Sequence, residues 1–229
     1  MTAQTCRPDG VLDKDQFRQV VKILEKRYLT GSKPEHVSDV DPFKILVGAL
    51  LSHRTRDEMT DIAYNELFSR YKNPAELADA DVREIAKTIK RVGFYRQKAK
   101  RIKKIARIIY GERGGRVPES REELMKLPGV GPKTADIVLS AAFSKPEVAV
   151  DTHVQAVAVR LGIASEKAGY EEIKRNITTL AAEEDLPIIN HLFVSFGREV
   201  CKKPRPKCSI CPITTFCKYY QTWVKASAL

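Results

Sequence analysis

An all-α fold is predicted for this chain of 229 residues, on three observations. Apolar residues recur at three- and four-residue spacing along most of the sequence. Strand signals are almost absent, and Glu147 to Val150 is the one short candidate. Cap residues and N-terminal prolines mark several helix starts. With 43% hydrophobic and 30% charged residues, the composition is that of a folded protein with a core.

The predicted helices follow one another closely. The first covers Asp13 to Leu29, where Phe17 begins an apolar stripe. Asp41-Pro42 predicts the N-cap and first position of a nearly all-apolar, buried helix that ends at Ser52. Capping boxes are expected at Asp81-x-x-Glu84 and Ser120-x-x-Glu123. The remaining helices are predicted over Arg56–Tyr71, closed by Asn73-Pro74, and over Arg96–Tyr110, Lys133–Ser144, Thr152–Leu161, Tyr170–Ala182 and Ile188–Val200. Ser144-Lys145-Pro146 is the best candidate for a domain boundary.

The charge balance favours a nucleic-acid partner. Forty Lys+Arg stand against 29 Asp+Glu, a net charge of +11. Between Lys87 and Arg107 there are ten Lys/Arg, no acidic residue, and the aromatics Phe94 and Tyr95. A solvated basic face is the alternative, but a polyanion would relieve the self-repulsion of such a stripe. Proteins that dock on anionic membranes can share such a basic surface. No apolar run approaches the roughly 18 residues of a membrane span, and no membrane partner is expected. The polar stretch Met1 to Gly10 leads us to expect an intracellular protein.

Four of the five cysteines lie close together near the C-terminus, with the spacing C-x6-C-x2-C-x5-C. They are Cys201, Cys208, Cys211 and Cys217. Such a cluster is typical of a metal centre and not of a secreted disulfide framework. Tetrahedral zinc and an iron–sulfur cluster both suit four thiolates. Only the middle pair has the short zinc-knuckle spacing, so the six-residue first loop favours iron–sulfur.

A short Gly/Pro segment, LPGVGPKTA from Leu127 to Ala135, predicts a tight helix–hairpin–helix. Its glycines allow positive φ and close approach, and Pro132 suits the first position of the second helix. The unpaired N–H groups at that helix start form an anion site suited to a nucleic-acid phosphate, although an ordinary tight turn is the alternative. The residues of this hairpin expected to contact DNA are Leu127, Gly129, Val130, Gly131 and Thr134.

Two residues are candidates for chemistry. Lys133 lies in the first turn of the second hairpin helix, where the positive helix end disfavours an ammonium. It is therefore a candidate amine nucleophile, or else a solvated or phosphate-pairing lysine. Asp151, in the segment VDTH, is either a helix N-cap, a role that Thr152 could fill instead, or a carboxylate that takes a proton and stabilises positive charge on a sugar. His153 beside it is a further candidate DNA contact, with a packed or hydrogen-bonding histidine as the alternative.

Taken in order, the apolar helix ending at Ser52, the LPGVGPKTA hairpin, the VDTH segment and the cysteine spacing resemble the endonuclease III family of base-excision DNA glycosylases. This family belongs to the helix-hairpin-helix/Gly-Pro-Asp superfamily. The resemblance covers roughly residues 15 to 222. It implies two α-helical domains flanking a DNA-binding cleft: a six-helix barrel over 35–145 with the hairpin at about 120–144, and an iron–sulfur domain made of 1–34 plus 146–229.

The resemblance also implies the activity and its residues. Lys133 matches the nucleophile, Asp151 the carboxylate, and the four cysteines the ligands of a C-terminal [4Fe-4S] cluster loop. Lys202, Lys203, Arg205 and Lys207 fill the first cysteine loop, which presents basic residues to DNA. The implied enzyme is a monomer of the cytoplasm and nucleoid. It removes damaged, oxidised pyrimidines from double-stranded DNA and cleaves the abasic site by β-elimination through a lysine Schiff base.

The sequence departs from the family pattern at two positions. Arg54 stands where a gap-filling glutamine is common, and Phe94 where a leucine wedge is common. Arg54 could still fill the gap and would suit guanine acceptors best. Two other functions remain open at this point: a monofunctional mismatch glycosylase, which typically lacks the hairpin lysine, and a non-catalytic DNA-binding module with structural zinc.

Overall fold

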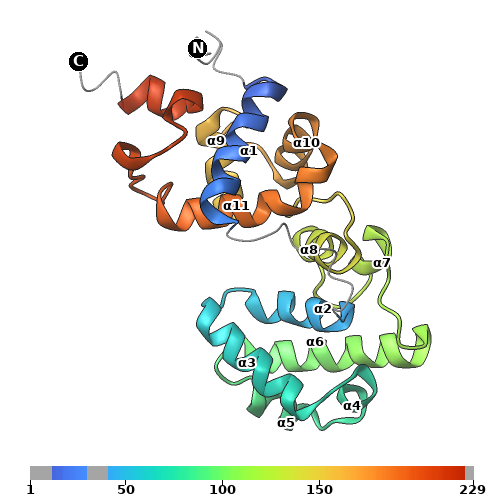
Figure 1. Cartoon of the computed structure of the whole chain (residues 1–229). Helices are drawn as coiled ribbons and strands as arrows, with labels where there is room; N and C mark the ends of the chain where they lie inside the picture. Colours follow the sequence, from blue (N-terminus) through green and yellow to red (C-terminus); the bar gives the residue numbers. More distant parts are fainter. Residues whose placement is uncertain (1–11, 30–40, 225–229) are drawn as a thin grey trace. The chain divides into compact units, whose positions relative to one another are not determined.

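The computed structural model describes residues 12–29 and 41–224, and these ranges contain helices and no β-strand (Figure 1). The all-α prediction is therefore confirmed, and Glu147 to Val150 is not a strand. The chain divides into two compact units, with the division after Lys145. No helix in the described ranges is long and apolar enough to cross a membrane.

The first unit contains the first helix and the chain after Lys145. Its helices are α1 (Lys14–Tyr28), α9 (Thr152–Leu161), α10 (Tyr170–Leu180) and α11 (Leu186–Glu199), followed by short turns at Cys208–Ile210, Thr214–Phe216 and Tyr220–Val224. A capping box starts α1, because Asp13 accepts from the Gln16 N–H at 2.8 Å and the Gln16 side chain accepts from the Asp13 N–H at 3.1 Å. Phe17 of α1 meets Phe193 of α11 edge-on in the core, with ring centroids 6.3 Å apart.

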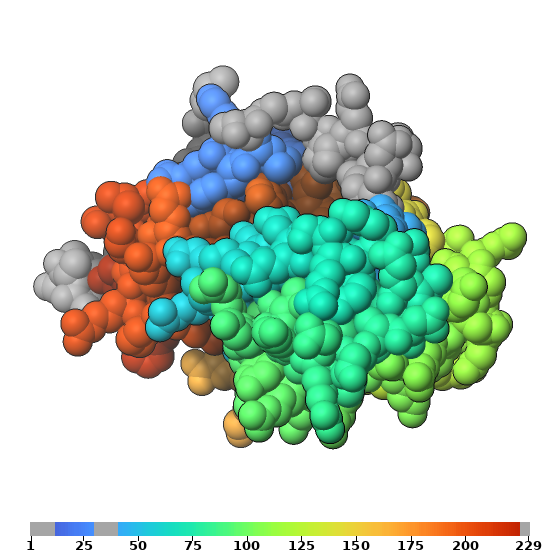
Figure 2. All heavy atoms as spheres, turned by 90° about the horizontal axis from the view of Figure 1, so that it is seen from below, coloured from blue at the N-terminus to red at the C-terminus, as the bar shows by residue number. Residues whose placement is uncertain are grey.

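The second unit runs from the second helix to Lys145. Its helices are α2 (Pro42–Ser52), α3 (Asp57–Arg70), α4 (Pro74–Asp79), α5 (Val82–Thr88), α6 (Tyr95–Arg107), α7 (Arg121–Met125) and α8 (Pro132–Phe143), with a π-helical turn at Ile108–Glu112 after α6. The apolar α2 is covered by α3 and α8, while α4 and α5 pack on α6. In Figure 2 the side chains of α3 to α6, cyan to green, form one continuous face.

Three local predictions are corrected by this unit. Asn73-Pro74 does not only close α3, because Asn73 is also the N-cap of α4 and accepts from the Glu76 N–H at 3.0 Å. The capping box expected at Asp81 is not formed: Asp81 accepts from the Arg83 N–H, and Glu84 pairs with Arg70 at 2.9 Å. At Ser120 only half of the box forms, since Glu123 pairs with Arg113 at 2.6 Å.

Candidate active site

The predicted hairpin joins α7 to α8. Gly129 has φ +83°, a conformation that favours glycine, and the Val130 N–H donates to the Leu127 carbonyl at 3.1 Å to close the turn. The side chains of Leu127 and Val130 are buried in the core of the second unit. Their side chains are therefore not available to a ligand, and the N–H groups of both residues donate within the chain.

The start of α8 offers unpaired donors. Its N-cap is Gly131, which supplies no side-chain oxygen, and Pro132 follows at the first position as predicted. The N–H groups of Gly131, Lys133 and Thr134 have no acceptor among the residues that the structure describes. Such N–H groups at the positive end of a helix form a site for an anion, and a DNA phosphate fits that chemistry.

A buried ion pair braces the hairpin. Arg121 Nε of α7 lies 2.9 Å from Asp136 Oδ1 of α8, and the Asp136 side chain is 0% exposed. Removing one partner of such a pair leaves a buried charge behind, which typically costs about 3–5 kcal/mol. The two hairpin helices are therefore tied in one orientation one turn beyond Lys133.

Lys133 lines a surface pocket of about 440 Å³. All of the lining residues belong to the second unit: Ser52, His53, Arg54, Phe94, Gln97, Lys98, Arg101 and Lys133. Four of them are cationic, and none of the lining residues in the described part of the chain is acidic. A pocket of this kind concentrates positive charge around one lysine amine, which suits an anionic substrate.

His53 connects this pocket to the start of α8. Its Nε2 lies 3.0 Å from Oγ1 of Thr134, the residue after Lys133. Burial, and then the charges of Lys133, Lys98 and Arg101, lower the pKa of His53. The imidazole is therefore neutral at physiological pH, and the link to Thr134 joins two uncharged groups. The Thr134 side chain is itself buried, so the backbone N–H is the part of this residue that is left for the predicted contact with DNA.

Arg54 and Phe94 form a pair at the edge of the same pocket. Both adopt left-handed backbone conformations, with φ 49° and 56°. The Arg54 guanidinium lies 5.7 Å from the centre of the Phe94 ring, which is 57% exposed. A Cβ at Gly93 would come within 2.7 Å of the Arg54 carbonyl oxygen, so only glycine allows this approach. Strained residues of this kind gather at functional sites.

Asp151 is the N-cap of α9. Its Oδ1 accepts from the N–H groups of His153 at 2.8 Å and Val154 at 2.9 Å, so Thr152 does not take this role. Both bonds use one oxygen, and Oδ2 has no hydrogen bond within the described ranges. The His153 ring packs tightly on α11, where a Cβ at Gly197 would lie 2.8 Å from His153 Nδ1.

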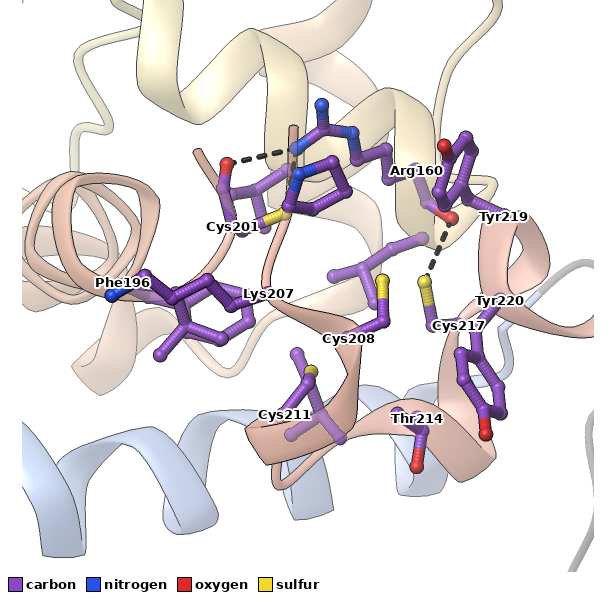
Figure 3. A pocket seen from close by; sticks show the side chains of 15 residues that line it. Arg160, Phe196, Cys201, Lys207, Cys208, Cys211, Thr214, Cys217, Tyr219 and Tyr220 are labelled. Carbon is purple, nitrogen blue, oxygen red and sulfur yellow. Dashed lines mark hydrogen bonds between the residues drawn. The ribbon is translucent and has the colours of Figure 1, made fainter. Parts of the chain in front are cut away.

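The four C-terminal cysteines line one small cavity of the first unit (Figure 3). The rest of the lining is largely apolar and includes Val157, Leu161 and Phe196. Arg160 of α9 donates to the Cys201 carbonyl at 2.8 Å and to Cys201 Sγ at 3.1 Å. Burial raises the pKa of the Cys217 thiol to about 12. Within the described ranges, no three His, Cys, Asp or Glu side chains are close enough to hold one metal ion between them.

The loop between the first two cysteines is basic and exposed. Lys202, Lys203, Arg205 and Lys207 all lie at the surface. The Lys207 N–H donates to the Val200 carbonyl at 2.8 Å, which closes the base of the loop. The tips of these side chains are therefore available to a polyanion.

Sequence reasoning missed five residues of the pocket: Ser52, His53, Gln97, Lys98 and Arg101. Lys98 precedes Ile102 by one helical turn and so lies on the apolar face of α6. This position in the sequence pattern indicated that the lysine is buried. Arg101 packs beneath the hairpin, where a Cβ at Gly129 would lie 2.7 Å from Arg101 Cδ. Nothing in the sequence indicates that contact, because the two residues belong to separate elements.

The chain is similar to base-excision repair proteins along most of its length. Residues 47–183 match the family model described as HhH-GPD superfamily base excision DNA repair protein. Endonuclease III of Thermotoga maritima is 45% identical over 205 residues, which cover 90% of this chain and 93% of that protein. Two solved structures are also similar. A trapped endonuclease III–DNA covalent intermediate has a TM-score of 0.82 and 33% identity, and the match covers 92% of this chain and 98% of that one. A thermostable thymine-DNA glycosylase has a TM-score of 0.81 and 28% identity, and the match covers 90% of this chain and 97% of that one.

The neutral His53 predicts a pH dependence of stability. The pKa of His53 is lower in the folded state than in the unfolded chain. As the pH falls through about 6.5, the unfolded chain therefore takes up the proton first, and this favours unfolding. The His53 contribution is therefore fully present above that pH and is lost below it. We expect the melting temperature of wild type to fall more steeply than that of His53→Gln between about pH 7.5 and about pH 5. If the melting temperatures of both proteins fell by the same amount over this pH range, the assignment of a neutral His53 would be contradicted.

Proposed function

Because this chain belongs to the endonuclease III family, within the HhH-GPD superfamily of base-excision DNA repair proteins, we propose that it removes oxidised pyrimidines from duplex DNA with Lys133 as the nucleophile. The family activity is that of a bifunctional DNA glycosylase and abasic-site lyase, and its substrate is damaged double-stranded DNA. The observation that carries the residue assignment is an amine at the start of α8, beside unpaired N–H groups and inside a cationic pocket. A substrate of this kind also implies a location in the cytoplasm and nucleoid.

The proposed reaction begins with extrusion of the damaged nucleotide, which costs a few kcal/mol and least where pairing is weak. The neutral Lys133 amine attacks C1′ of the sugar, the new C–N bond replaces the bond to the base, and the base leaves as the amine proton is transferred away. Opening of the sugar ring gives an imine. Loss of a proton from C2′ then expels the 3′ phosphate oxygen, and the strand is cut on the 3′ side of the lesion.

We assign Asp151 the role of the carboxylate in this reaction. Its Oδ1 is occupied as the cap of α9, so Oδ2 is the oxygen available to accept a proton or to stabilise positive charge on the sugar. One carboxylate oxygen thus fixes the side chain while the other is left for the substrate. Lys133 belongs to the second unit and Asp151 to the first.

The DNA contacts are proposed on chemistry that each unit offers separately. Backbone N–H groups of the hairpin at Gly129, Gly131 and Thr134 would bind a phosphate. The Arg54–Phe94 pair would enter the space left by the extruded nucleotide, with the exposed ring as the wedge and the guanidinium offering donors to the orphaned base. Lys202, Lys203 and Arg205 would bind the backbone at a second place, and the packing of His153 on Gly197 limits it to a lesser contact.

The domain assignment follows the same logic. We propose that 35–145, with the hairpin at about 120–144, is the six-helix barrel domain, and that 1–34 plus 146–229 is the iron–sulfur domain.

The donor set of the cysteine cavity fits a [4Fe-4S] cluster. A single zinc ion would need its sulfur ligands within about 2.3 Å of one point. All four cysteines line one cavity, and the six-residue loop between the first two leaves room for an object larger than one ion. When bound, the cluster would hold the basic loop in place.

Removal of the proposed nucleophile tests the function directly. Borohydride should trap a covalent adduct between wild-type protein and DNA that carries an abasic site. In Lys133→Gln we expect the adduct to vanish and strand cleavage to fall by about 10³-fold or more. Lys126→Gln, a change in the neighbouring exposed ion pair with Glu123, is the matched control and should trap normally. An adduct that persists in Lys133→Gln would refute the assignment.

The role of Asp151 is tested by an isosteric change. Asp151→Asn keeps an oxygen that can cap α9 but loses the negative charge, so we expect base excision to fall by about 10²–10⁴-fold while DNA affinity changes little. Asp151→Ser retains capping without any carboxylate and should behave alike. If either variant loses DNA binding and thermal stability in proportion to activity, the residue is a cap and not part of the chemistry.

The cofactor has its own signature. Purified protein should be brown, with broad visible absorption and about four iron atoms per chain. Cys211→Ala should lose this absorption, whereas Cys6→Ala, a change of the fifth cysteine outside the C-terminal group, should keep it. A colourless protein that contains one zinc ion would overturn the cluster and support the alternative of a structural zinc module.

A further inference from the structure

Lys98 is a buried cation at the base of the pocket. Its side chain lies on the core face of α6 and the residue is only 5% exposed. Three oxygen atoms surround its Nζ: the Leu51 carbonyl at 2.7 Å, the His53 carbonyl at 2.6 Å and Thr55 Oγ1 at 3.0 Å. These match the three donors of an ammonium. No carboxylate pairs with it in the described ranges.

All three acceptors lie within residues 51–55, the turn in which α2 ends and the chain continues toward α3. Leu51 is among the last residues of α2, so the cation lies where the helix dipole favours positive charge. Thr55 Oγ1 also accepts from the Gly93 N–H at 3.1 Å, which ties the segment before α6 to the same turn. The ammonium thus gathers three segments of the chain at one point.

The turn leads directly to Lys133. The His53 carbonyl is held by Lys98, and the His53 ring bonds to Thr134, whose neighbour is Lys133. The next residue of the turn is Arg54, whose left-handed conformation places its guanidinium on Phe94. A shift of the turn would therefore move both the proposed gap-filling pair and the contact beside the nucleophile.

The charged form of Lys98 is destabilised at this position. Burial, and then the charge of Arg101, lower the pKa of Lys98 to about 8, so the fold disfavours the very cation that it surrounds with oxygen atoms. A leucine or methionine would pack on the core face of α6 without that cost. A position that keeps a disfavoured charge is a candidate for a functional role.

We propose that Lys98 is a positioning residue for the reaction: its ammonium fixes the turn of residues 51–55, and through it the placement of His53 and Arg54 around Lys133. This inference rests on the proposed function of Lys133. It adds that the nucleophile and the gap-filling pair are aligned by one group that touches neither the substrate nor the reacting atoms.

The test measures the single-turnover rate of borohydride trapping on DNA with a preformed abasic site. Lys98→Met should slow trapping by about 10–100-fold, the size of effect that a misplacement of about 1 Å produces. Lys103→Met is the matched control, because Lys103 of the same helix also binds a backbone carbonyl, that of Ala80, but outside the pocket. It should trap at the wild-type rate. Lys98→Gln, which keeps two donors, provides a second variant in case Lys98→Met does not fold, and should show a smaller loss.

Two further readouts separate positioning from general loss of structure. In a double-mutant cycle, Lys98→Met should add little to the loss caused by His53→Ala, because both act through the same turn. In NMR titrations of folded Lys98→Gln, the His53 imidazole should gain its proton at a higher pH than in wild type, since a neighbouring cation has gone.

The outcomes distinguish the two proposals. If Lys133→Gln still forms the adduct, the proposed function fails and Lys98 has no reaction to support. If wild type traps, Lys133→Gln does not, and folded Lys98→Met or Lys98→Gln traps at the wild-type rate, only the positioning role is overturned. Losses that multiply fully in the cycle, or an unchanged His53 titration, would also overturn it.

Discussion

The tight turn at Gly129 is the constraint on which the site depends. Its positive φ lets the chain reverse between α7 and α8 while Leu127 and Val130 stay in the core. Because α8 then starts at the surface with a glycine as its N-cap, its first N–H groups lack internal partners and Lys133 stands among them. The Arg121–Asp136 pair holds the two helices in this orientation. A buried ion pair is weak evidence for stability, so its value here lies in fixing one arrangement of the hairpin.

Positive charge is concentrated around that helix start to a degree that folding alone would not favour. Arg54, Lys98, Arg101 and Lys133 line one pocket without a carboxylate among the described lining residues. Elsewhere in the same unit, cations such as Arg70 and Arg113 have acidic partners. Lys98 is buried among oxygen atoms, so Arg54, Arg101 and Lys133 are the charges for which a polyanion would supply the counter-charge. The basic stripe of the sequence contributes to this site only through the face of α6 that lines the pocket.

Much of the fold was predictable because it depends on local signals. The apolar periodicity of α1 and the Asp41-Pro42 start of α2 each act within a few residues, and both are found as predicted. Asn73-Pro74 misled because the same dipeptide can end one helix and begin the next, and here it does both. The helical phase of Lys98 indicated its burial, but its oxygen partners and the His53–Thr134 link could not be predicted. These contacts join residues 43 to 81 positions apart, and only packing of α2, α6 and α8 brings them together.

The cysteine segment differs from the rest of the fold, because it has too little regular structure and too few buried side chains to be stable by itself. After α11 the described chain forms only short turns, and few of its side chains, among them Ile213 and Phe216, are buried. A segment with so little core is ordinarily stabilised by a metal or by disulfides. Arg160 already organises one side of the cavity, where its guanidinium bonds to Cys201 and lies 5.5 Å from the centre of the Tyr219 ring. A cluster bound by all four thiolates would tie the remaining turns to that arginine, and the basic first loop would then be presented to DNA from a fixed base.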